Sequence, residues 1–406
     1  MKKDIKYLKC IKCGNIYKPD EVLYTCPSCG EDGVLWFEYD YKNITIKKDD
    51  DFIKKWRDIF PFEDVSVLNF RNMFPSPIYS NKNISNYLNL PFLYFKDDTR
   101  NPSGSFKDRA SIFVLQHALN KGYREISIAS TGNAASSMAA IGAAFGINTH
   151  IFVPYTIPKP KLAQLIIYGA DIIMINGNYD KAFDLSIEIS KEFGWYIRNT
   201  GFNPYTVEGK KTVSLEIVDQ IGTPDWVFVP TGDGCILGGV YKGFYDLHKL
   251  GLMEKMPRLM AVQAEGSSSI VTAFIKKKMV PIKVNAKTIA DSISVDYPRN
   301  GIMALKGLYD TNGSGITVSD NEILSAQKIL GERGGIFSEP ASAAAFSAVI
   351  KAKRQGIIKE NDKIVVLLTG NGLKDIESIK IPPLKIFDDS GKIREYIKKR
   401  REKNEL

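Results

Sequence analysis

The chain has 406 residues, of which 44% are hydrophobic and 25% are charged, and this composition is ordinary for a soluble globular protein. Its length allows two sizeable domains and a smaller third unit, because a domain usually has roughly 100–200 residues. The formal net charge is +9, but much of the excess lies in the basic segment 398–403, so the charge alone does not predict nucleic-acid binding. No run reaches the roughly 18–20 apolar residues that cross a bilayer, and the first residues do not resemble a signal peptide, which favours a cytoplasmic protein.

Four of the five cysteines lie near the N-terminus, in the pattern Cys10-x2-Cys13-x12-Cys26-x2-Cys29. Two such pairs can present four thiolates to one tetrahedral metal ion, and a glycine after each pair permits a tight turn. Soft thiolates favour zinc, and four of them leave no open position, so the predicted site is structural rather than catalytic. Two disulfides are the alternative, which a cytosolic chain does not favour. The pattern predicts a zinc ribbon over residues 1–40.

Beyond the ribbon, a polar and aromatic stretch over residues 39–74 is predicted to be a connecting segment. From about residue 92, short apolar runs alternate with amphipathic segments of helical length, which indicates an α/β protein with parallel sheets covered by helices on both faces. In such folds, ligands bind beyond the carboxyl ends of the strands. Predicted strands cover residues 126–129, 150–153, 171–175, 226–229, 259–262 and 364–368, and predicted helices cover residues 106–120, 159–168, 179–193, 209–221 and 320–331.

Lysine is the best candidate for the catalytic side chain. The three histidines (His117, His150 and His248) all lie inside predicted strands or helices, so histidine chemistry is poorly supported. Lys107 follows the turn Asn101-Pro-Ser-Gly and stands at the start of a helix, where the positive end of the helix dipole favours a neutral amine. A neutral amine can attack a carbonyl carbon, so Lys107 is predicted to carry covalent catalysis.

Three glycine-containing motifs each follow a predicted strand. Ser130-Thr-Gly-Asn-Ala134 opens a helix whose free amides can bind an anion such as a carboxylate. Pro230-Thr-Gly-Asp-Gly-Cys-Ile-Leu-Gly-Gly239 suits a loop that wraps a phosphate, and it matches neither common nucleotide-binding pattern. Leu368-Thr-Gly-Asn-Gly-Leu-Lys-Asp375 ends another strand. We expect Cys235 to contribute its amide rather than a nucleophile, and Glu339 either to line the site or to cap a helix.

Together these motifs resemble threonine synthase and, more widely, the fold-type II enzymes that use pyridoxal 5′-phosphate (PLP). The resemblance covers roughly residues 92–376 and also rests on Val207-Glu-Gly-Lys-Lys-Thr212 and Glu339-Pro-Ala-Ser342. It implies a homodimer acting on a small amino acid, and an N-terminal cysteine ribbon also occurs in some members of the family. The implied fold has two parallel-sheet domains of the tryptophan synthase β type: a large PLP-binding domain (41–122 and 208–385) and a small substrate-side domain (123–207), with the ribbon (1–40) before them and a basic tail (386–406) after them.

The resemblance also implies roles for single residues. Lys107 would form the Schiff base with PLP and then shuttle protons, while Asn133 would bond to the ring hydroxyl and Thr369 would meet the pyridine nitrogen. A hydroxyl at that nitrogen suits elimination and replacement better than transamination. The backbone amides of Gly232, Asp233, Gly234, Cys235 and Ile236 would hold the PLP phosphate, and those of Ser130, Thr131, Asn133 and Ala134 would hold the substrate carboxylate.

The chain departs from the threonine synthase pattern where a phosphorylated substrate would bind. The arginine that precedes the family's Glu-Gly-Gln-Lys-Thr stretch is Thr206 here, and the threonine that usually follows Ser-Thr-Gly-Asn is Ala134. The cofactor loop, Gly-Asn-Ala-Gly-Asn in the family, is Gly232-Asp-Gly-Cys-Ile236 here, so it loses its second asparagine and gains the negative charge of Asp233. The family's Ala-Thr-Ala-Ile-Arg-Ile-Gly-Asn-Pro is Ala290-Asp-Ser-Ile-Ser-Val-Asp-Tyr-Pro298, which places Ser294 at the arginine position. Each lost charge-assisted hydrogen bond costs roughly 1.5–3 kcal/mol. We therefore expect compensation by Arg299 or a lysine if the substrate carries a phosphate.

Three functions remain open at this stage. The first is threonine synthase activity, in which phosphate is eliminated from Cγ of O-phosphohomoserine and water adds at Cβ. The second is β-elimination, dehydration or β-replacement on an unphosphorylated amino acid such as serine or threonine. The third, from a different class, is a nucleic-acid-binding ribbon protein without PLP, which would be colourless on purification.

Overall fold

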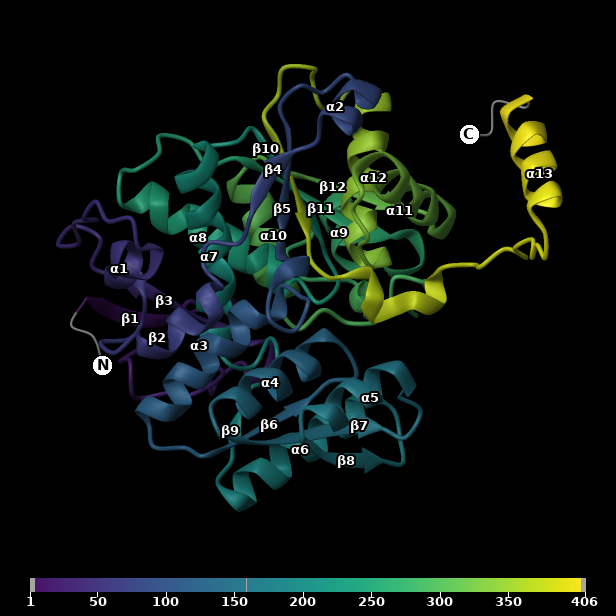
Figure 1. Ribbon diagram of the computed structural model, residues 1–406. Coiled ribbons are helices and arrows are strands. Elements are labelled where there is room, and N and C mark those ends of the chain that lie inside the picture. Colours follow the sequence, from purple (N-terminus) through teal and green to yellow (C-terminus); the bar gives the residue numbers. More distant parts are fainter. Residues whose placement is uncertain (1–3, 158, 403–406) are drawn as a thin grey trace. The chain divides into compact units, whose positions relative to one another are not determined.

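Three sheets organise the computed structural model, which describes residues 4–157 and 159–402 (Figure 1). The chain divides into two units, one that ends at Asp375 and a C-terminal one that begins at Ile376. Within the described residues, no helix combines the length and the apolar character that a membrane span requires. The first sheet is antiparallel and has the order β2-β1-β3, from β1 (Ile5–Cys10), β2 (Ile16–Tyr17) and β3 (Leu35–Tyr39).

The largest sheet has the strand order β12-β11-β10-β13-β5-β4, and all its pairs are parallel except the edge pair of β4 and β5. Strands β10 and β13 are buried along their whole length. This explains their uninterrupted apolar sequences, because helices cover both faces of a parallel sheet. The strands are β4 (Ile78–Ser80), β5 (Leu93–Asp97), β10 (Trp226–Pro230), β11 (Arg258–Ala264), β12 (Ser314–Val318) and β13 (Ile364–Leu368).

Helix α12 packs on β10 and β13, while α8 packs on β10 and β11 from the opposite face, with α7 against α8 (Figure 1). Helix α3 in turn packs against α7. The helices associated with this sheet are α2 (Lys82–Leu88), α3 (Lys107–Asn120), α7 (Tyr205–Ile221), α8 (Cys235–Lys249), α9 (Ser269–Ile275), α10 (Gly301–Asp310), α11 (Asp320–Gly334) and α12 (Pro340–Arg354).

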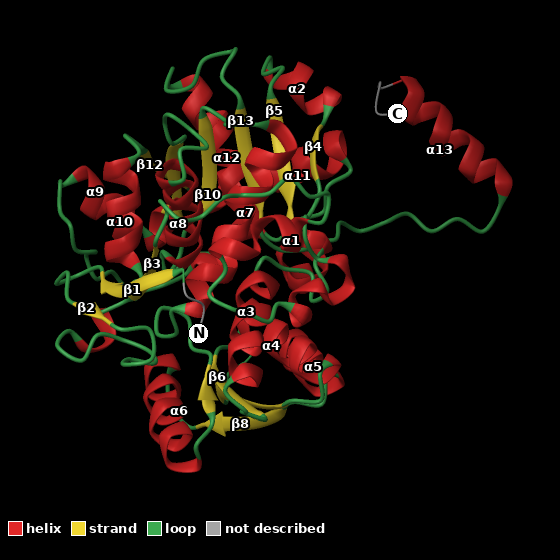
Figure 2. Cartoon of the chain, turned by 90° about the vertical axis from the view of Figure 1, so that its left-hand side faces the viewer, coloured by secondary structure: helices red, strands yellow, loops and turns green. Residues whose placement is uncertain are grey.

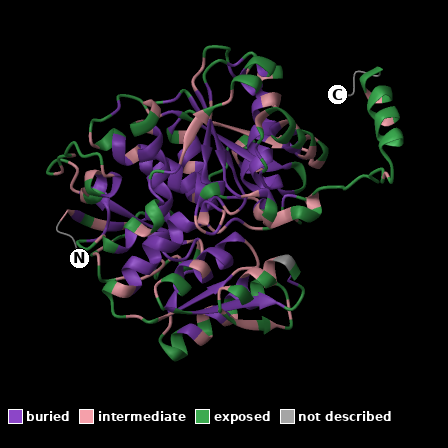
Figure 3. Cartoon of the chain, in the orientation of Figure 1, coloured by how far each residue is buried: buried purple, intermediate pink, exposed green. Residues whose placement is uncertain are grey.

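The third sheet is parallel throughout and has the order β8-β7-β6-β9. Helices α4 and α5 lie on one face of this sheet and α6 lies on the other (Figure 2). Buried residues run through both parallel sheets and the helices that cover them (Figure 3). The elements are β6 (Glu125–Ala129), α4 (Asn133–Ala144), β7 (Asn148–Pro154), α5 (Lys159–Ile167), β8 (Asp171–Ile175), α6 (Tyr179–Phe193) and β9 (Tyr196–Ile197).

The predicted α/β fold with parallel sheets is confirmed. Strands β8 and β13 and helix α6 have the predicted bounds, α3 begins one residue after the predicted Phe106, and the other predicted elements differ by a few residues at their ends. Helix α7 begins at Tyr205, four residues before the predicted Gly209, directly after Pro204. Proline has the φ angle of a helix and needs no amide partner there, so it suits a helix start.

The stretch over residues 39–74 is packed rather than a free connector. It contains α1 (Phe52–Trp56), whose Trp56 is buried and donates a hydrogen bond to Asp219 of α7 at 2.7 Å. The ring of Phe60 meets that of Phe113 of α3 edge-on, 5.2 Å between centroids. The aromatic residues of this stretch therefore belong to the core beneath α3 and α7.

The C-terminal unit contains α13 (Ser390–Glu402), which has no buried residue within its described length. Its last turn carries Lys399, Arg400 and Arg401. This agrees with the interpretation of the basic tail as a solvated helix end.

Candidate active site

The carboxyl ends of strands from both parallel sheets open into one cavity of about 780 Å³. The segments that line it follow β5, β6, β8, β10 and β13, where a parallel fold is expected to bind its ligand. Every residue predicted to bind the cofactor or the substrate carboxylate lines this cavity: Lys107, Ser130, Thr131, Asn133, Ala134, Gly232, Asp233, Gly234, Cys235, Ile236 and Thr369.

Lys107 is the first residue of α3 and is fixed by its neighbours on both sides. The Phe106 amide donates to the Thr369 carbonyl at 2.9 Å, and the Asp108 carboxylate accepts from the Ser103 amide at 2.7 Å. The Lys107 amine forms no hydrogen bond or ion pair with any residue that the structure describes. Burial lowers the pKa of this ammonium, and the Glu339 carboxylate partly opposes that effect. The amine is therefore both unpartnered and easily deprotonated.

Asn133 and Glu339 form a polar edge of the cavity. The Asn133 amide donates to Glu339 Oε2 at 2.9 Å and to the Ser292 hydroxyl at 3.2 Å. Glu339 is the N-cap residue of α12, but its side chain forms no capping hydrogen bond. Burial raises the pKa of the Glu339 carboxyl, while the hydrogen bond from Asn133 acts in the opposite direction. Of the two expectations for Glu339, the structure supports the one in which it lines the site.

The loop before α8 has a backbone that only glycine permits. Gly234 is the N-cap residue, with φ of 80°, and a Cβ there would lie 2.7 Å from the Asn300 carbonyl oxygen. A Cβ on Gly232 would lie 2.8 Å from Cα of Ile293. The amides of the first helical turn have no partner inside the helix and carry the positive end of its dipole. This geometry suits a phosphate.

Two side chains of the same loop are restrained. Asp233 Oδ1 accepts a hydrogen bond from the Arg299 backbone amide at 2.6 Å, and Asp233 Oδ2 lies 3.4 Å from Cys235 Sγ. Burial raises the pKa of the Asp233 carboxyl, and both burial and the Asp233 charge raise the pKa of the Cys235 thiol. Cys235 is consequently a protonated thiol at neutral pH, which makes it a poor nucleophile.

Thr369 stands at the end of β13 and is positioned from α12. Ser342 Oγ accepts hydrogen bonds from the backbone amides of Thr369 and Gly370, each at 2.9 Å. The Thr369 hydroxyl lies 3.4 Å from the same oxygen. A Cβ on Gly370 would lie 2.2 Å from Cδ of Glu339, so only glycine fits at position 370, where the backbone after Thr369 passes the Glu339 side chain.

Two buried cations near the cavity were not identified from the sequence. Lys210 is fully buried and its Nζ has no hydrogen-bond partner in the described structure, and burial lowers its pKa to about 7. Arg198 is also fully buried, contacts the Ser111 and Thr200 hydroxyls, and pairs with no described carboxylate. Burial lowers the pKa of Arg198 to about 10. The sequence carried a signal for Lys210, because a lysine stands there where the family's Glu-Gly-Gln-Lys-Thr stretch has glutamine. No sequence pattern indicates a role for Arg198.

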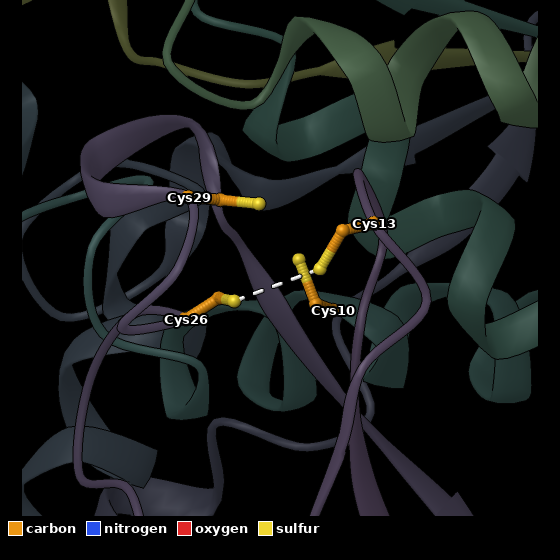
Figure 4. A group of neighbouring side chains, drawn as sticks. All are labelled: Cys10, Cys13, Cys26 and Cys29. Carbon is orange, nitrogen blue, oxygen red and sulfur yellow. Dashed lines mark hydrogen bonds between the residues drawn. The ribbon is translucent and has the colours of Figure 1, made fainter.

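The four N-terminal cysteines meet as predicted (Figure 4). Their Sγ atoms lie within 4.8 Å of one another, and all four are free thiols. Gly14 and Gly30, one after each pair, have φ angles of 80° and 59° that favour glycine. The cluster could hold a metal ion, as four converging thiolates do in structural sites.

Comparison with known proteins gives one consistent result. A family model described as pyridoxal-phosphate dependent enzyme matches residues 70–370. Threonine synthase of Methanocaldococcus jannaschii is 36% identical over 405 residues, which cover 96% of this chain and 99% of that protein. Threonine synthase of Methanosarcina acetivorans is 35% identical over 92% of this chain and 93% of that protein. Among solved structures, the processed form of threonine deaminase isoform 2 from Solanum lycopersicum has a TM-score of 0.64 over 75% of this chain and 85% of that chain, and its 23% identity indicates a shared fold alone.

Proposed function

This chain is a carbon–oxygen lyase of the threonine synthase family of pyridoxal-phosphate-dependent enzymes, and from that premise we propose that it converts O-phosphohomoserine and water into L-threonine and phosphate. The observation that carries the proposal is that one cavity brings together an unpartnered lysine, a helix N-terminus suited to an anion and a glycine loop. The three motifs that supply these groups follow one another along the sequence in the order found in the family. Similarity to threonine synthases over almost the whole chain supports the choice of substrate.

The residues present fit PLP. An unpartnered amine at Lys107 and a glycine-walled loop at the start of α8 suit a phosphorylated aldehyde, and the buried amine of Lys210, which has no hydrogen-bond partner among the described residues, adds a cation to the surroundings of the loop. When bound, PLP supplies an electron sink for the bonds broken at the substrate. We assign the loop amides of residues 232–236 to its phosphate, Thr369 to its pyridine nitrogen and Asn133 to its ring hydroxyl.

The chain's own residues position the substrate and move protons. The amides from Ser130 to Ala134, at the start of α4, would hold the carboxylate, since a helix N-terminus stabilises an anion. Lys107, with its lowered pKa, would accept and return protons along the substrate carbons. In the balance of the reaction, the Cγ–O bond breaks and phosphate leaves, Cγ gains a proton, Cβ loses a proton and gains the hydroxyl of water, and the remaining proton of water goes to the phosphate.

The test is phosphate release and product analysis with the purified, PLP-loaded protein. We expect phosphate and threonine in equal amounts from O-phosphohomoserine, and neither from K107A. Release of phosphate without threonine, or no release at all, would contradict the proposed reaction.

A second candidate function, dehydration of serine or threonine, has one structural observation in its favour. Thr206, at the family's arginine position, is fully buried, and its hydroxyl donates to the Asn203 carbonyl at 2.8 Å rather than facing the cavity. Position 206 therefore offers no side chain that could bind a substrate phosphate in place of the family's arginine. If serine or threonine yields a 2-oxo acid and ammonia while O-phosphohomoserine yields no phosphate, the chain is a dehydratase.

We also propose that Cys10, Cys13, Cys26 and Cys29 bind one structural zinc ion. Four thiolates in a tetrahedral arrangement suit zinc and leave no open position for catalysis.

A further inference from the structure

The cysteine ribbon contributes a side chain to the wall of the active-site cavity. Glu31 stands two residues after Cys29, lines the cavity and forms an ion pair with the guanidinium of Arg299. The neighbouring ribbon residue, Asp32, lies 3.4 Å from the hydroxyl of Tyr297, which also lines the cavity. Two adjacent ribbon carboxylates thus hold two residues of the segment 297–299.

The stem of Arg299 is fixed. Its backbone amide donates to Asp233 of the cofactor loop at 2.6 Å, and a Cβ on Gly201 would lie 2.8 Å from Arg299 Cβ. The guanidinium lies 3.7 Å from the ring centroid of Phe183. The head of the side chain is therefore directed along the cavity wall, where its second carboxylate contact is Asp180 at 3.5 Å.

The carboxylate partners of Arg299 are exchangeable. The Glu31 side chain is 49% exposed and that of Asp180 is 68% exposed, whereas that of Arg299 is 16% exposed. Ion pairs with solvent-exposed carboxylates contribute little, because water and salt screen them. A phosphate offers arginine two parallel charge-assisted hydrogen bonds, which are stronger. A phosphorylated ligand in this cavity would therefore displace Glu31.

We propose that Arg299 is the residue that recognises the distal anionic group of the substrate, and that Glu31 positions Arg299 in the free enzyme and competes with the substrate for it. The inference rests on the proposed function in taking that group to be a phosphate. Both family arginine positions are Thr206 and Ser294 here, and among the described residues Arg299 is the arginine that lines the cavity.

The cysteine cluster sets the position of Glu31. The turn that carries it, Gly30–Asp32, closes through the hydrogen bond from the Cys26 amide to the Gly33 carbonyl at 2.8 Å. A Cβ on Gly33 would lie 2.6 Å from Cys26 Cβ, so the turn is packed directly against the cysteines. The ribbon therefore acts as a wall of the substrate pocket.

The test measures binding rather than turnover. The Kd values of O-phosphohomoserine and of homoserine are measured by rapid mixing, from the first change in cofactor absorbance of the PLP-loaded enzyme before any turnover. Their ratio gives the preference for the phosphorylated ligand. We expect R299Q to reduce this preference by about tenfold or more, because a bidentate charged contact is lost, with little change for homoserine. R299K should retain part of the preference, since a lysine keeps the charge but not the planar fork.

Substitution of Glu31 should change the affinity for O-phosphohomoserine in the opposite direction. E31Q should bind O-phosphohomoserine more tightly, by about threefold, because the competing carboxylate is removed. D20N is the matched control: Asp20 is a ribbon carboxylate that pairs with Lys121 away from this cavity, so its substitution should leave both Kd values unchanged.

Equal weakening of both ligands by R299Q, weaker phosphorylated-ligand binding in E31Q, or no preference in the unsubstituted enzyme would each overturn the inference. An Arg299-dependent preference without threonine formation would leave the inference standing and refute the proposed function instead. Melting temperatures of all variants show that each is folded.

Discussion

Lys210 illustrates how a single buried side chain changes the chemistry around a cavity. It lies in α7 at the position where the family has glutamine, and its stem packs against Gly239, where a Cβ would lie 2.4 Å from Lys210 Cβ. The base of the side chain therefore packs on α8, and its amine interacts with the charges of Arg198, Lys107 and Asp233. A phosphate bound at the loop would favour the charged amine, because an opposite charge nearby raises the pKa of an ammonium.

The first prediction concerns Lys210 in the cofactor-free protein. Burial lowers its pKa to about 7 from an ordinary value of 10.5. Between these two values the unfolded chain binds a proton that the folded chain does not, so the Lys210 contribution to stability rises with pH. The stability of the unsubstituted protein relative to K210Q should therefore increase between pH 7 and 10, by up to about 1.4 kcal/mol per pH unit. Urea unfolding at pH 7.5, 8.5 and 9.5 measures this difference, and a pH-independent difference would contradict it.

The second prediction concerns Lys107. K107A should lose the borohydride-reducible link to PLP, and its activity should fall by at least roughly 100-fold, because a proton-transferring group is removed. Mass spectrometry of the reduced protein locates the cofactor. The exposed Lys283 of the same cavity provides the control, and K283Q should keep the link on Lys107. Modification of another lysine in the unsubstituted protein would refute the assignment.

At the residue scale, motif reasoning found the side chains at strand ends and missed those that reach the cavity from elsewhere. Asn133 and Thr369 lie beyond the carboxyl ends of β6 and β13, where a parallel sheet presents its ligand-binding residues, and Lys107 begins the helix that follows β5. The two strands belong to different sheets, so only the tertiary structure shows that these ends meet at one cavity. Glu31 enters the cavity from the ribbon, which no local pattern could indicate. The positions of the predicted residues agree with their assigned roles, and the roles themselves stay predictions.

At the scale of elements, α7 connects the active site to two buried ionic clusters. On one side, Glu216 pairs with Arg109 and with Lys96, each at 2.6 Å, and all three side chains are fully buried. On the other, Lys211 pairs with Asp246 at 2.8 Å. The family-like sequence Val207–Thr212 thus takes part in buried ionic contacts between helices, through Lys211 and Thr212, which a motif comparison does not reveal.

The third prediction tests the first of these clusters. E216Q should destabilise the protein by about 3–5 kcal/mol, because it leaves Arg109 and Lys96 buried with too little negative charge. The control is E332Q on α11, where Lys328 and Glu332 form an exposed pair with side chains 72% and 66% exposed, and we expect a change below about 0.5 kcal/mol. Equilibrium urea unfolding gives both free energies. A loss in E216Q as small as that of the control would show that the cluster contributes little.

Element boundaries were predictable where apolar periodicity was strong and not where aromatic residues were scattered among charges. Strand β13 and helix α6 follow regular patterns and were located to the residue. The stretch over residues 39–74 has no such period, because its buried residues, among them Trp56 and Phe60, pack individually against α3 and α7. Only the tertiary structure reveals that this stretch belongs to the core.

At the scale of the whole unit up to Asp375, the ribbon contacts the rest of the enzyme at several places. The Tyr39 hydroxyl at the end of β3 donates to Glu208 of α7 at 2.5 Å, and Tyr41 donates to Asp246 of α8 at 2.7 Å. Other contacts are the ion pair of Glu31 with Arg299 and that of Asp20 with Lys121. The cysteine spacing predicted a ribbon, but its polar and apolar contacts with the enzyme join residues far apart in the sequence, which the spacing does not reveal. The ribbon is thus positioned to link metal binding to the shape of the cavity.

The last prediction follows from that linkage. The purified protein should contain one zinc ion per chain by elemental analysis, and a chelator with reductant should remove it. Because binding of a structural metal supplies folding free energy, amide hydrogen exchange should then accelerate in residues 10–14 and 26–33. Exchange should also accelerate in residues 297–299, which the ribbon carboxylates hold, and stay slow in the fully buried strand β10. Acceleration confined to the cysteine loops would show that the ribbon does not hold the cavity wall, whereas acceleration in β10 would mean that the metal supports the entire fold.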